Sequence, residues 1–329
     1  MKIGLTYDLK EDYLKEGYSV EETAELDIPE TVNGIESAIR KLGYETERIG
    51  NIRSLIKRLN DNARWDLVFN ICEGVNGTYS RESQVPALLE AYNIAYTFSD
   101  PVVLGISLKK DLTKTIVRAN GFKTPDFFVI KTAEDIDKLN LAYPLFVKPV
   151  AEGSSKGIAD KSKVENKNQL KTASLELLKK FKQPVLVETY CSGREFTVGM
   201  IGTGIKAECI GGMEVILNEK AEKNAYSYKN KAMYEEVVEY KLITDIKLNE
   251  EIKEFAVGAW RALECRDAGR VDIMLDKDGD INFIEVNPLA GLNPNYSDLP
   301  IMFSMSTKKM QTHTIFFFVF VTVKNNLHQ

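Results

Sequence analysis

The chain has 329 residues with a formal net charge of −5, and 44% of its residues are hydrophobic. This length predicts two or three domains with ordinary cores, and the acidic balance gives no basic field for binding nucleic acid. The four cysteines lie far apart with no CxxC pair, which argues against a zinc site or disulfide framework and is typical of a reducing cytoplasm.

Both histidines, His313 and His328, lie near the C-terminus. The rest of the chain therefore has no histidine base, metal ligand or catalytic triad, and its chemistry must use carboxylates, lysine, arginine, serine and metal ions. That set suits phosphoryl transfer, in which neutralising charge matters more than moving protons. We expect no signal peptide, because residues 2–7 already have the pattern of a strand.

Residues 1–98 alternate strand patterns with helical patterns. This order predicts an α/β unit with a mostly parallel sheet and ligands at the carboxyl edge of that sheet. In the first helix apolar residues recur at spacings of three and four. The expected strands are 2–7, 65–70 and 94–97, and the expected helices are about 29–42 and 82–92.

Two further units, 99–185 and 186–304, mix strands and helices in an α+β manner. In the first we expect helices at 109–119 and about 168–181, with strands at 127–130 and 145–148. In the second we expect strands at 185–190, 195–201 and 206–216, a Lys/Tyr-rich loop at 222–234, a helix at about 248–263 and a hairpin at 270–288.

The segment at 146–158, FVKPVAEGSSKGI, places a lysine in an apolar strand and follows it with a polar loop. Lys148 is of a type seldom buried without a partner, and Pro149 ends the strand because it cannot donate to a sheet ladder. The loop at 152–157 can direct several backbone N–H groups at one anion. It is not a Walker A loop, and a polar turn between strands is an equally good interpretation of the loop alone.

The hairpin carries the strongest local signal for a metal site. With a two-residue turn at 278–279, Asp272 falls opposite Glu285, and Arg270 falls opposite Asn287. Like charges that face each other across strands are destabilising, so these two carboxylates favour a cation between them. Hard oxygen ligands suit magnesium together with substrate phosphates. The alternative is an acidic hairpin exposed on the surface.

Four other side chains are candidates for binding a nucleotide. Lys148 and Lys110 can supply cations for phosphates, although a single lysine is more often a solvated surface residue. Glu188 ends an apolar strand, and Glu195 follows on the next strand. These two glutamates could face an adenine and a ribose, or they could be surface residues at strand ends.

Together, these motifs resemble the ATP-grasp superfamily and, within it, the D-alanine–D-alanine ligase family, over nearly all of residues 60–300. The resemblance implies a three-domain α/β architecture, with ATP held between the sheets of the second and third domains. The segments that carry it are FN at 69–70, KKDLTK at 109–114, FVKPVAEGSSKGI at 146–158, VE at 187–188, GREFTV at 193–198, RVD at 270–272 and FIEVNP at 283–288.

The resemblance also implies roles for individual residues. ATP and Mg²⁺ are the implied cofactors, with Mn²⁺ as an alternative metal. The implied phosphate-binding residues are Lys110, Lys148, Ser154, Ser155 and Lys231. The implied adenine-side and ribose-side residues are Glu188 and Glu195. The implied metal ligands are Asp272, Glu285 and Asn287. The implied catalytic residues are Arg270, Lys231 and Ser154.

The resemblance implies an ATP-dependent carboxylate–amine ligase that forms an amide through an acyl phosphate. Its substrates would be small amino acids or peptides, with no nucleic-acid or membrane partner, and a homodimer is one assembly that it allows. Two alternatives stay open on the sequence alone. One is a non-catalytic ATP-binding module, and the other is an ATP-dependent kinase of a small carboxylate.

The amino-acid subsites depart from the family pattern. The family's first-subsite glutamate has no equivalent at 7–12, Glu73 stands where the family has histidine, and Ala232 stands where it has tyrosine. The stretch that binds the second substrate is Asn-Pro-Leu-Ala-Gly at 287–291. Glu73 adds negative charge and Ala232 opens space, so we expect a substrate larger or more cationic than D-alanine.

The tail at 305–329 also departs from the family, in which a C-terminal helix would follow. Its apolar run at 315–323 is far shorter than the roughly 20 residues of a membrane helix. We expect a buried strand, prone to aggregation when exposed. An altered reading frame or a truncation is our hypothesis for its origin, and it would leave the third domain poorly closed.

Overall fold

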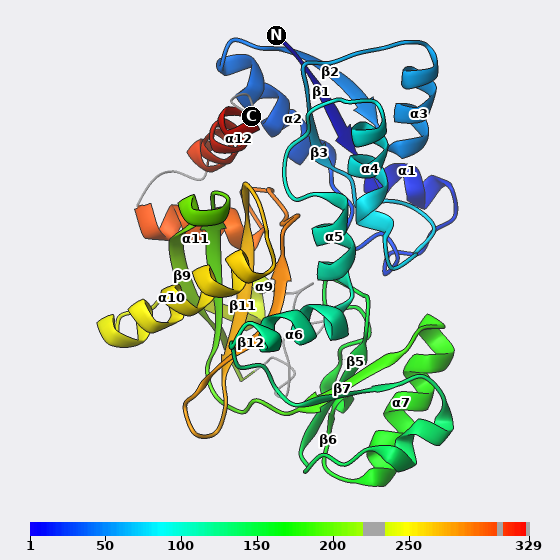
Figure 1. The fold of residues 1–329 in the computed structure, drawn as a ribbon, viewed down its shortest axis with the longest axis vertical. Helices are drawn as coiled ribbons and strands as arrows, with labels where there is room; N and C mark the ends of the chain where they lie inside the picture. The colour runs from blue at the N-terminus through cyan, green and yellow to red at the C-terminus, as the bar shows by residue number, and fades with distance from the viewer. Residues whose placement is uncertain (220–233, 308–311, 327–329) are drawn as a thin grey trace.

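The computed structural model describes residues 1–219, 234–307 and 312–326. The strands of those residues form three sheets, each covered by helices, which follow one another along the chain (Figure 1). No helix in the described part of the chain is long and apolar enough to cross a membrane.

The first sheet is parallel, in the order β2-β1-β3. Sequence patterns missed β2 because it is an edge strand with four charged or polar residues in six. The strand expected at 94–97 is only a bridge between Val68 and Tyr96. The elements are β1 (Lys2–Tyr7), α1 (Lys10–Lys15), α2 (Pro29–Lys41), β2 (Glu45–Gly50), α3 (Ile52–Asn60), β3 (Leu67–Ile71), η1 (Arg81–Ser83) and α4 (Gln84–Ala91).

The second sheet is antiparallel, in the order β4-β7-β5-β6. Helix α7 begins where the Asn166 side chain accepts a hydrogen bond from the backbone of Gln169, and it buries Leu170, Ala173 and Leu177 against the sheet. The elements are α5 (Pro101–Leu108), α6 (Lys110–Ala119), β4 (Phe127–Ile130), η2 (Ala133–Lys138), β5 (Leu145–Pro149), η3 (Asp160–Ser162), β6 (Lys163–Val164), α7 (Lys167–Phe181) and β7 (Val185–Thr189).

The third sheet has the order β10-β9-β8-β11-β12 and is also antiparallel. Phe196 and Val198 on one face of β8 share a core with Trp260 of α10, while Gly199 on the other face lies under Leu299 of α11. The elements are β8 (Glu195–Ile201), η4 (Gly204–Lys206), β9 (Glu208–Leu217), α9 (Tyr234–Val237), β10 (Val238–Leu242), α10 (Ile246–Ala262), β11 (Ala268–Leu275), β12 (Ile281–Asn287) and α11 (Asp298–Thr307).

The predicted pairing of the hairpin residues at 270–272 is confirmed, but the predicted two-residue turn is not. Asp272 does pair with Glu285. The turn, however, is a three-residue loop at 277–279 closed by Asp276 and Asp280, with Gly279 at φ +85°. A bulge between Asp272 and the next residue then shifts the pairing by one. The longer turn and the bulge shift the pairing by one residue in opposite directions. Asp272 therefore faces Glu285, as predicted.

The strand expected in the tail is a helix, α12 (Thr312–Asn326), so that expectation was wrong. Its buried side chains include Phe318, Val319 and Val323, which follow one helical face. They join the core of the first sheet with Ile35 and Ile39 of α2. A uniformly apolar run has no period that distinguishes strand from helix, and here the run covers the N-terminal sheet.

We predict that Phe318→Ala will lower the free energy of unfolding by about 3–5 kcal/mol, because it leaves a cavity in this core. Phe320 of the same helix is 41% exposed and provides a matched control. Phe320→Ala should cost less than about 1 kcal/mol. Urea denaturation measures both variants, and equal losses would show that α12 does not pack against α2 as described.

Candidate active site

A cavity of about 440 Å³ lies where segments from all three units of the chain meet. The first unit contributes Glu25, Glu73 and Glu82, and the second contributes residues before and within the 152–157 loop. The third contributes the ends of β11 and β12 and the following loop. Five residues predicted from the sequence line this cavity: Lys110, Ser154, Arg270, Glu285 and Asn287.

The predicted metal ligands lie together at the edge of the third sheet. Thr197 Oγ1 donates to Asp272 Oδ1 at 2.7 Å, and Asn287 Nδ2 donates to Asp272 Oδ2 at 3.1 Å. Burial raises the pKa of Asp272 to about 6, with Glu285 adding to the rise and Arg270 opposing it. The two carboxylates of Asp272 and Glu285 therefore favour a cation between them.

This donor set fits magnesium rather than a metal held by protein groups alone. The described residues contain no group of three or more His, Cys, Asp or Glu side chains arranged around a metal. Two carboxylates and a carboxamide are instead the kind of set with which Mg²⁺ is held between protein and substrate phosphates.

Arg270 is held beside these carboxylates. Its Nη2 lies 3.3 Å from Asp272 Oδ2, and its Nη1 forms an ion pair with Asp298. Asp298 in turn accepts a hydrogen bond from the Tyr240 hydroxyl at 2.8 Å. Sequence reasoning missed Asp298, whose position at the start of α11 brings it to the cavity.

Lys148 is buried in an ion-pair network. Its Nζ lies 2.6 Å from Glu188 Oε1, and Lys114 Nζ lies 3.0 Å from Glu188 Oε2. Burial would raise the pKa of Glu188, but Lys114 and Lys148 outweigh it and hold the pKa below its usual value. Burial would likewise lower the pKa of Lys148, but Glu188 and then Glu285 outweigh it, so Lys148 stays charged.

Lys114 was not predicted, although its spacing of four from Lys110 puts both on one face of α6. Its Nζ also donates to Thr124 Oγ1 at 3.0 Å and to the Phe283 carbonyl of β12 at 3.2 Å. Burial lowers its pKa to about 8, with Glu188 opposing and nearby Lys148 adding to the decrease.

Lys110 connects the 152–157 loop to the metal side of the cavity. Its Nζ donates to the Glu152 carbonyl at 2.6 Å and lies 3.3 Å from Glu285 Oε2. In the loop itself, Ser154 and Ser155 have φ of +47° and +55°. This left-handed backbone is rare for residues other than glycine and signals a functional constraint. Ser154 lines the cavity, whereas Ser155 does not.

The remaining predicted residues lie apart from the cavity or outside the described ranges. Glu195 pairs with Met274 across the third sheet. Burial raises its pKa to about 8, with Asp272 and Glu285 adding to the rise. Lys231, with neighbouring Ala232, lies outside the described residues.

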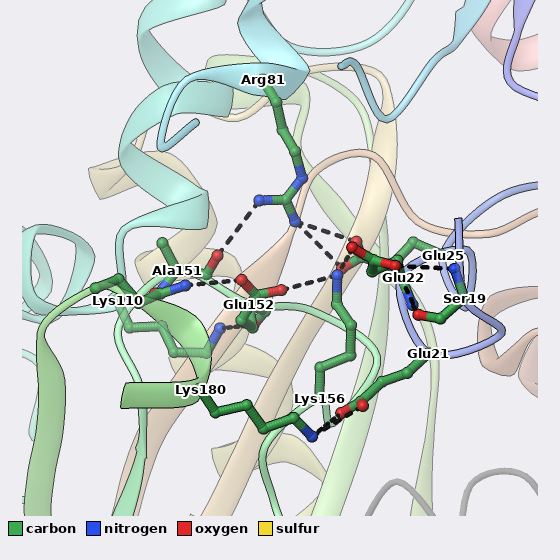
Figure 2. A network of polar contacts seen from close by, with 11 residues as sticks. Ser19, Glu21, Glu22, Glu25, Arg81, Lys110, Ala151, Glu152, Lys156 and Lys180 are labelled. Atoms are coloured by element: carbon green, nitrogen blue, oxygen red, sulfur yellow. Dashed lines mark hydrogen bonds and ion pairs between the residues drawn. The ribbon is translucent and has the colours of Figure 1, made fainter. Parts of the chain in front are cut away.

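The wall from the first unit carries charges that sequence reasoning missed, except Glu73. Arg81 Nη2 lies 3.1 Å from Glu25 Oε2, and Lys156 Nζ lies 2.8 Å from the same oxygen (Figure 2). Glu82 also lines the cavity, and its burial raises its pKa to about 7 against the opposing effect of Arg81. Arg81 and Glu82 lie in η1 and Lys156 lies in the 152–157 loop of the second unit, so only the fold brings them to Glu25.

Comparison with known proteins gives a consistent result. Residues 116–313 match the family described as D-ala D-ala ligase C-terminus. A D-alanine–D-alanine ligase of Aquifex aeolicus is 34% identical over 265 residues, which are 80% of this chain and 84% of that protein. An uncharacterized protein of Sinorhizobium fredii is 30% identical over 79% of this chain and 78% of its own length.

Solved structures show the same fold. A D-alanine–D-alanine ligase from Bacillus anthracis, crystallised with ATP, matches 100% of this chain and 99% of its own, with a TM-score of 0.72 and 23% identity. The VanG D-Ala:D-Ser ligase from Enterococcus faecalis matches 98% of this chain and 99% of its own, with a TM-score of 0.70 and 21% identity.

We predict that Glu188→Gln will lower the free energy of unfolding by about 3–5 kcal/mol, because it leaves two buried ammonium groups without their carboxylate. The control is Glu176→Gln, which removes an exposed partner of Lys161 and should cost less than about 1 kcal/mol. Chemical denaturation measures both, and a loss near that of the control would contradict the buried network.

Proposed function

The chain belongs to the D-alanine–D-alanine ligase family and is an ATP-dependent ligase of the ATP-grasp fold, and from this premise we propose that it joins an amino-acid carboxylate to an amine through an acyl phosphate. Family membership favours this function over a non-catalytic ATP-binding module or a kinase. We place the reaction in the cytoplasm, and we assign domains to 1–98, 99–185 and 186–304.

The observation that carries the proposal is the meeting of Lys110, Arg270, Glu285 and Asn287 in one cavity. Phosphoryl transfer depends on positioned charge more than on covalent chemistry by the protein. Lys110 and charged Lys148 would bind phosphate oxygens, and Arg270, fixed by two carboxylates, would stabilise negative charge that develops during transfer. Asp272, Glu285 and Asn287 would hold Mg²⁺, which when bound neutralises phosphate charge.

The reaction has two steps. The substrate carboxylate attacks the γ-phosphorus, the bond to the bridging oxygen breaks, and ADP leaves with the electron pair. The amine then attacks the acyl carbon, and phosphate leaves to form the amide. The amine proton passes to a substrate oxygen or to water, since no histidine lines the described part of the cavity.

The acidic wall supports a cationic substrate. Burial raises the pKa of Glu73 well above its usual value, and neighbouring Glu82 adds to the rise. An ammonium group placed between these carboxylates would stabilise their charged forms. We therefore propose that the amino-acid subsite favours larger or more cationic amino acids or short peptides over D-alanine.

We predict that Glu285→Gln will lower kcat by about 100-fold or more, because it removes a metal-binding carboxylate. The free energy of unfolding should change much less than in Glu188→Gln, because relief of the repulsion with Asp272 offsets the loss of the Lys110 pair. Glu239→Gln, on exposed β10, is the control. Full activity of Glu285→Gln at saturating Mg²⁺ would remove Glu285 from the metal site.

The test of function and specificity is a screen of amino-acid pairs for ATP-dependent phosphate release, with products identified by mass. We expect turnover that requires both a carboxylate and an amine substrate. Lysine-like or other larger amino acids should give a higher kcat/KM than D-alanine. Phosphate release without an amine would indicate a kinase instead. Robust turnover with D-alanine alone, yielding D-alanyl-D-alanine, would contradict the specificity proposal.

A further inference from the structure

The segment at 19–25, between α1 and α2, forms an ordered turn. Ser19 donates to Glu22 Oε2 from its backbone at 2.8 Å and from its hydroxyl at 2.7 Å, and the Glu22 backbone donates back to Ser19 Oγ at 3.2 Å. This reciprocal pattern resembles a capping box and orders the start of the turn. Glu21 in the same segment also pairs with Lys180 of α7, and Glu25 lies at the end of the turn.

Glu25 lies directly against the 152–157 loop. A Cβ added to Gly153 would lie only 2.1 Å from Glu25 Oε1, so glycine is needed for this approach. Glu25 also accepts from Lys156 Nζ at 2.8 Å and from Arg81 Nη2 at 3.1 Å. Figure 2 shows these side chains converging on one carboxylate from separate segments of the chain.

The contacts continue to the catalytic side of the loop. Lys156 Nζ also lies 2.8 Å from Glu152 Oε2, and the Glu152 carbonyl accepts from Lys110 at 2.6 Å. Lys110 in turn contacts Glu285. A continuous chain of polar contacts thus runs from Arg81 in the first unit, through the loop, to the predicted metal site.

The charges of this cluster balance. Arg81 and Lys156 supply two cations, and Glu25 and Glu152 supply two anions, with all four side chains largely buried. Burial would raise the pKa of Glu25, but Arg81 and Lys156 outweigh it and hold the pKa at about 2. Glu25 is therefore ionised at neutral pH.

We propose that Glu25, Arg81, Glu152 and Lys156 form a clasp that holds the phosphate-covering loop in its binding position, with Glu25 and Lys156 as positioning residues. Neither touches the predicted metal site. They act through the loop backbone, which presents Ser154 to the cavity. The inference rests on the proposed function only for its effect on ATP, because the contacts of the clasp are all between protein groups.

The clasp also closes the wall between two cavities. A second cavity, of about 750 Å³, lies on the other side of the loop and is lined by Glu25, Glu152 and Lys156. Glu25 lines the first cavity as well. The Glu25–Lys156 contact therefore lies between the two cavities, and its removal would weaken the attachment of the loop to the first unit.

The test compares Lys156→Met and Glu25→Gln with two controls. Lys156→Met leaves the Glu25–Arg81 pair intact, and Glu152 keeps its bond from Gln183 Nε2 at 2.7 Å, so this variant is expected to fold. Lys156→Arg retains the charge. Lys180→Met removes a neighbouring, more exposed contact with Glu21.

The first readout is hydrogen exchange without nucleotide, at the loop amides of Lys156 and Ile158, which donate to Gly153 and Ser155 carbonyls. We expect exchange about tenfold faster in Lys156→Met and Glu25→Gln, which corresponds to about 1.4 kcal/mol. Lys156→Arg and Lys180→Met should exchange like the unmodified protein. Unchanged exchange in Lys156→Met and Glu25→Gln would overturn the clasp.

The second readout is kinetic. The KM for ATP should rise about tenfold in Lys156→Met, while the KM for amino-acid substrates changes less than about twofold. Faster loop exchange with an unchanged KM for ATP would overturn the positioning role. Glu25-dependent loop protection in a protein that shows no ATP-dependent turnover would support the clasp and count against the proposed function instead.

Discussion

One buried ammonium group joins the second and third sheets. Lys114 extends from α6 to Glu188 on the second sheet and to the Phe283 carbonyl on the third. A buried ammonium group is costly unless it keeps all of its hydrogen-bond and ion-pair partners. Helix α6, Glu188 and the Phe283 carbonyl must therefore keep their positions relative to one another. Fixing Glu188 also fixes Lys148, and fixing β12 fixes Glu285. The positions of the other site residues therefore depend on the distance that Lys114 sets between the second and third sheets.

Charges of opposite sign then alternate across the cavity. Lys110 lies between the Glu152 carbonyl and Glu285, and Arg270 lies between Asp272 and Asp298. In such an arrangement each cation is already oriented by an anion before any substrate arrives. That preorganisation is what lets fixed charges stabilise a phosphoryl-transfer reaction without paying for reorganisation at the moment of transfer.

The sequence predicted the parts of this site that lie within strands and short motifs. Lys110 and Lys148 lie in short sequence motifs. The pairing of Asp272 with Glu285 follows from the strand pattern, although it came out right only because the longer turn and the bulge offset each other. Arg81 and Glu25 could not be found in this way, because 56 residues separate them and only the fold joins them. The α12 helix was misassigned because its apolar run lacks a period.

The three units contribute different kinds of residue to the cavity. Residues expected to bind ATP come from the second and third units, whose sheets are joined by Lys114. The acidic wall comes from the first unit, with Glu73 in a loop and Glu82 in the short helix η1. Because loops tolerate change better than paired strands, substitutions there can alter the amino-acid subsite while the phosphate-binding geometry stays fixed. The Glu25 contacts then connect this wall to the 152–157 loop.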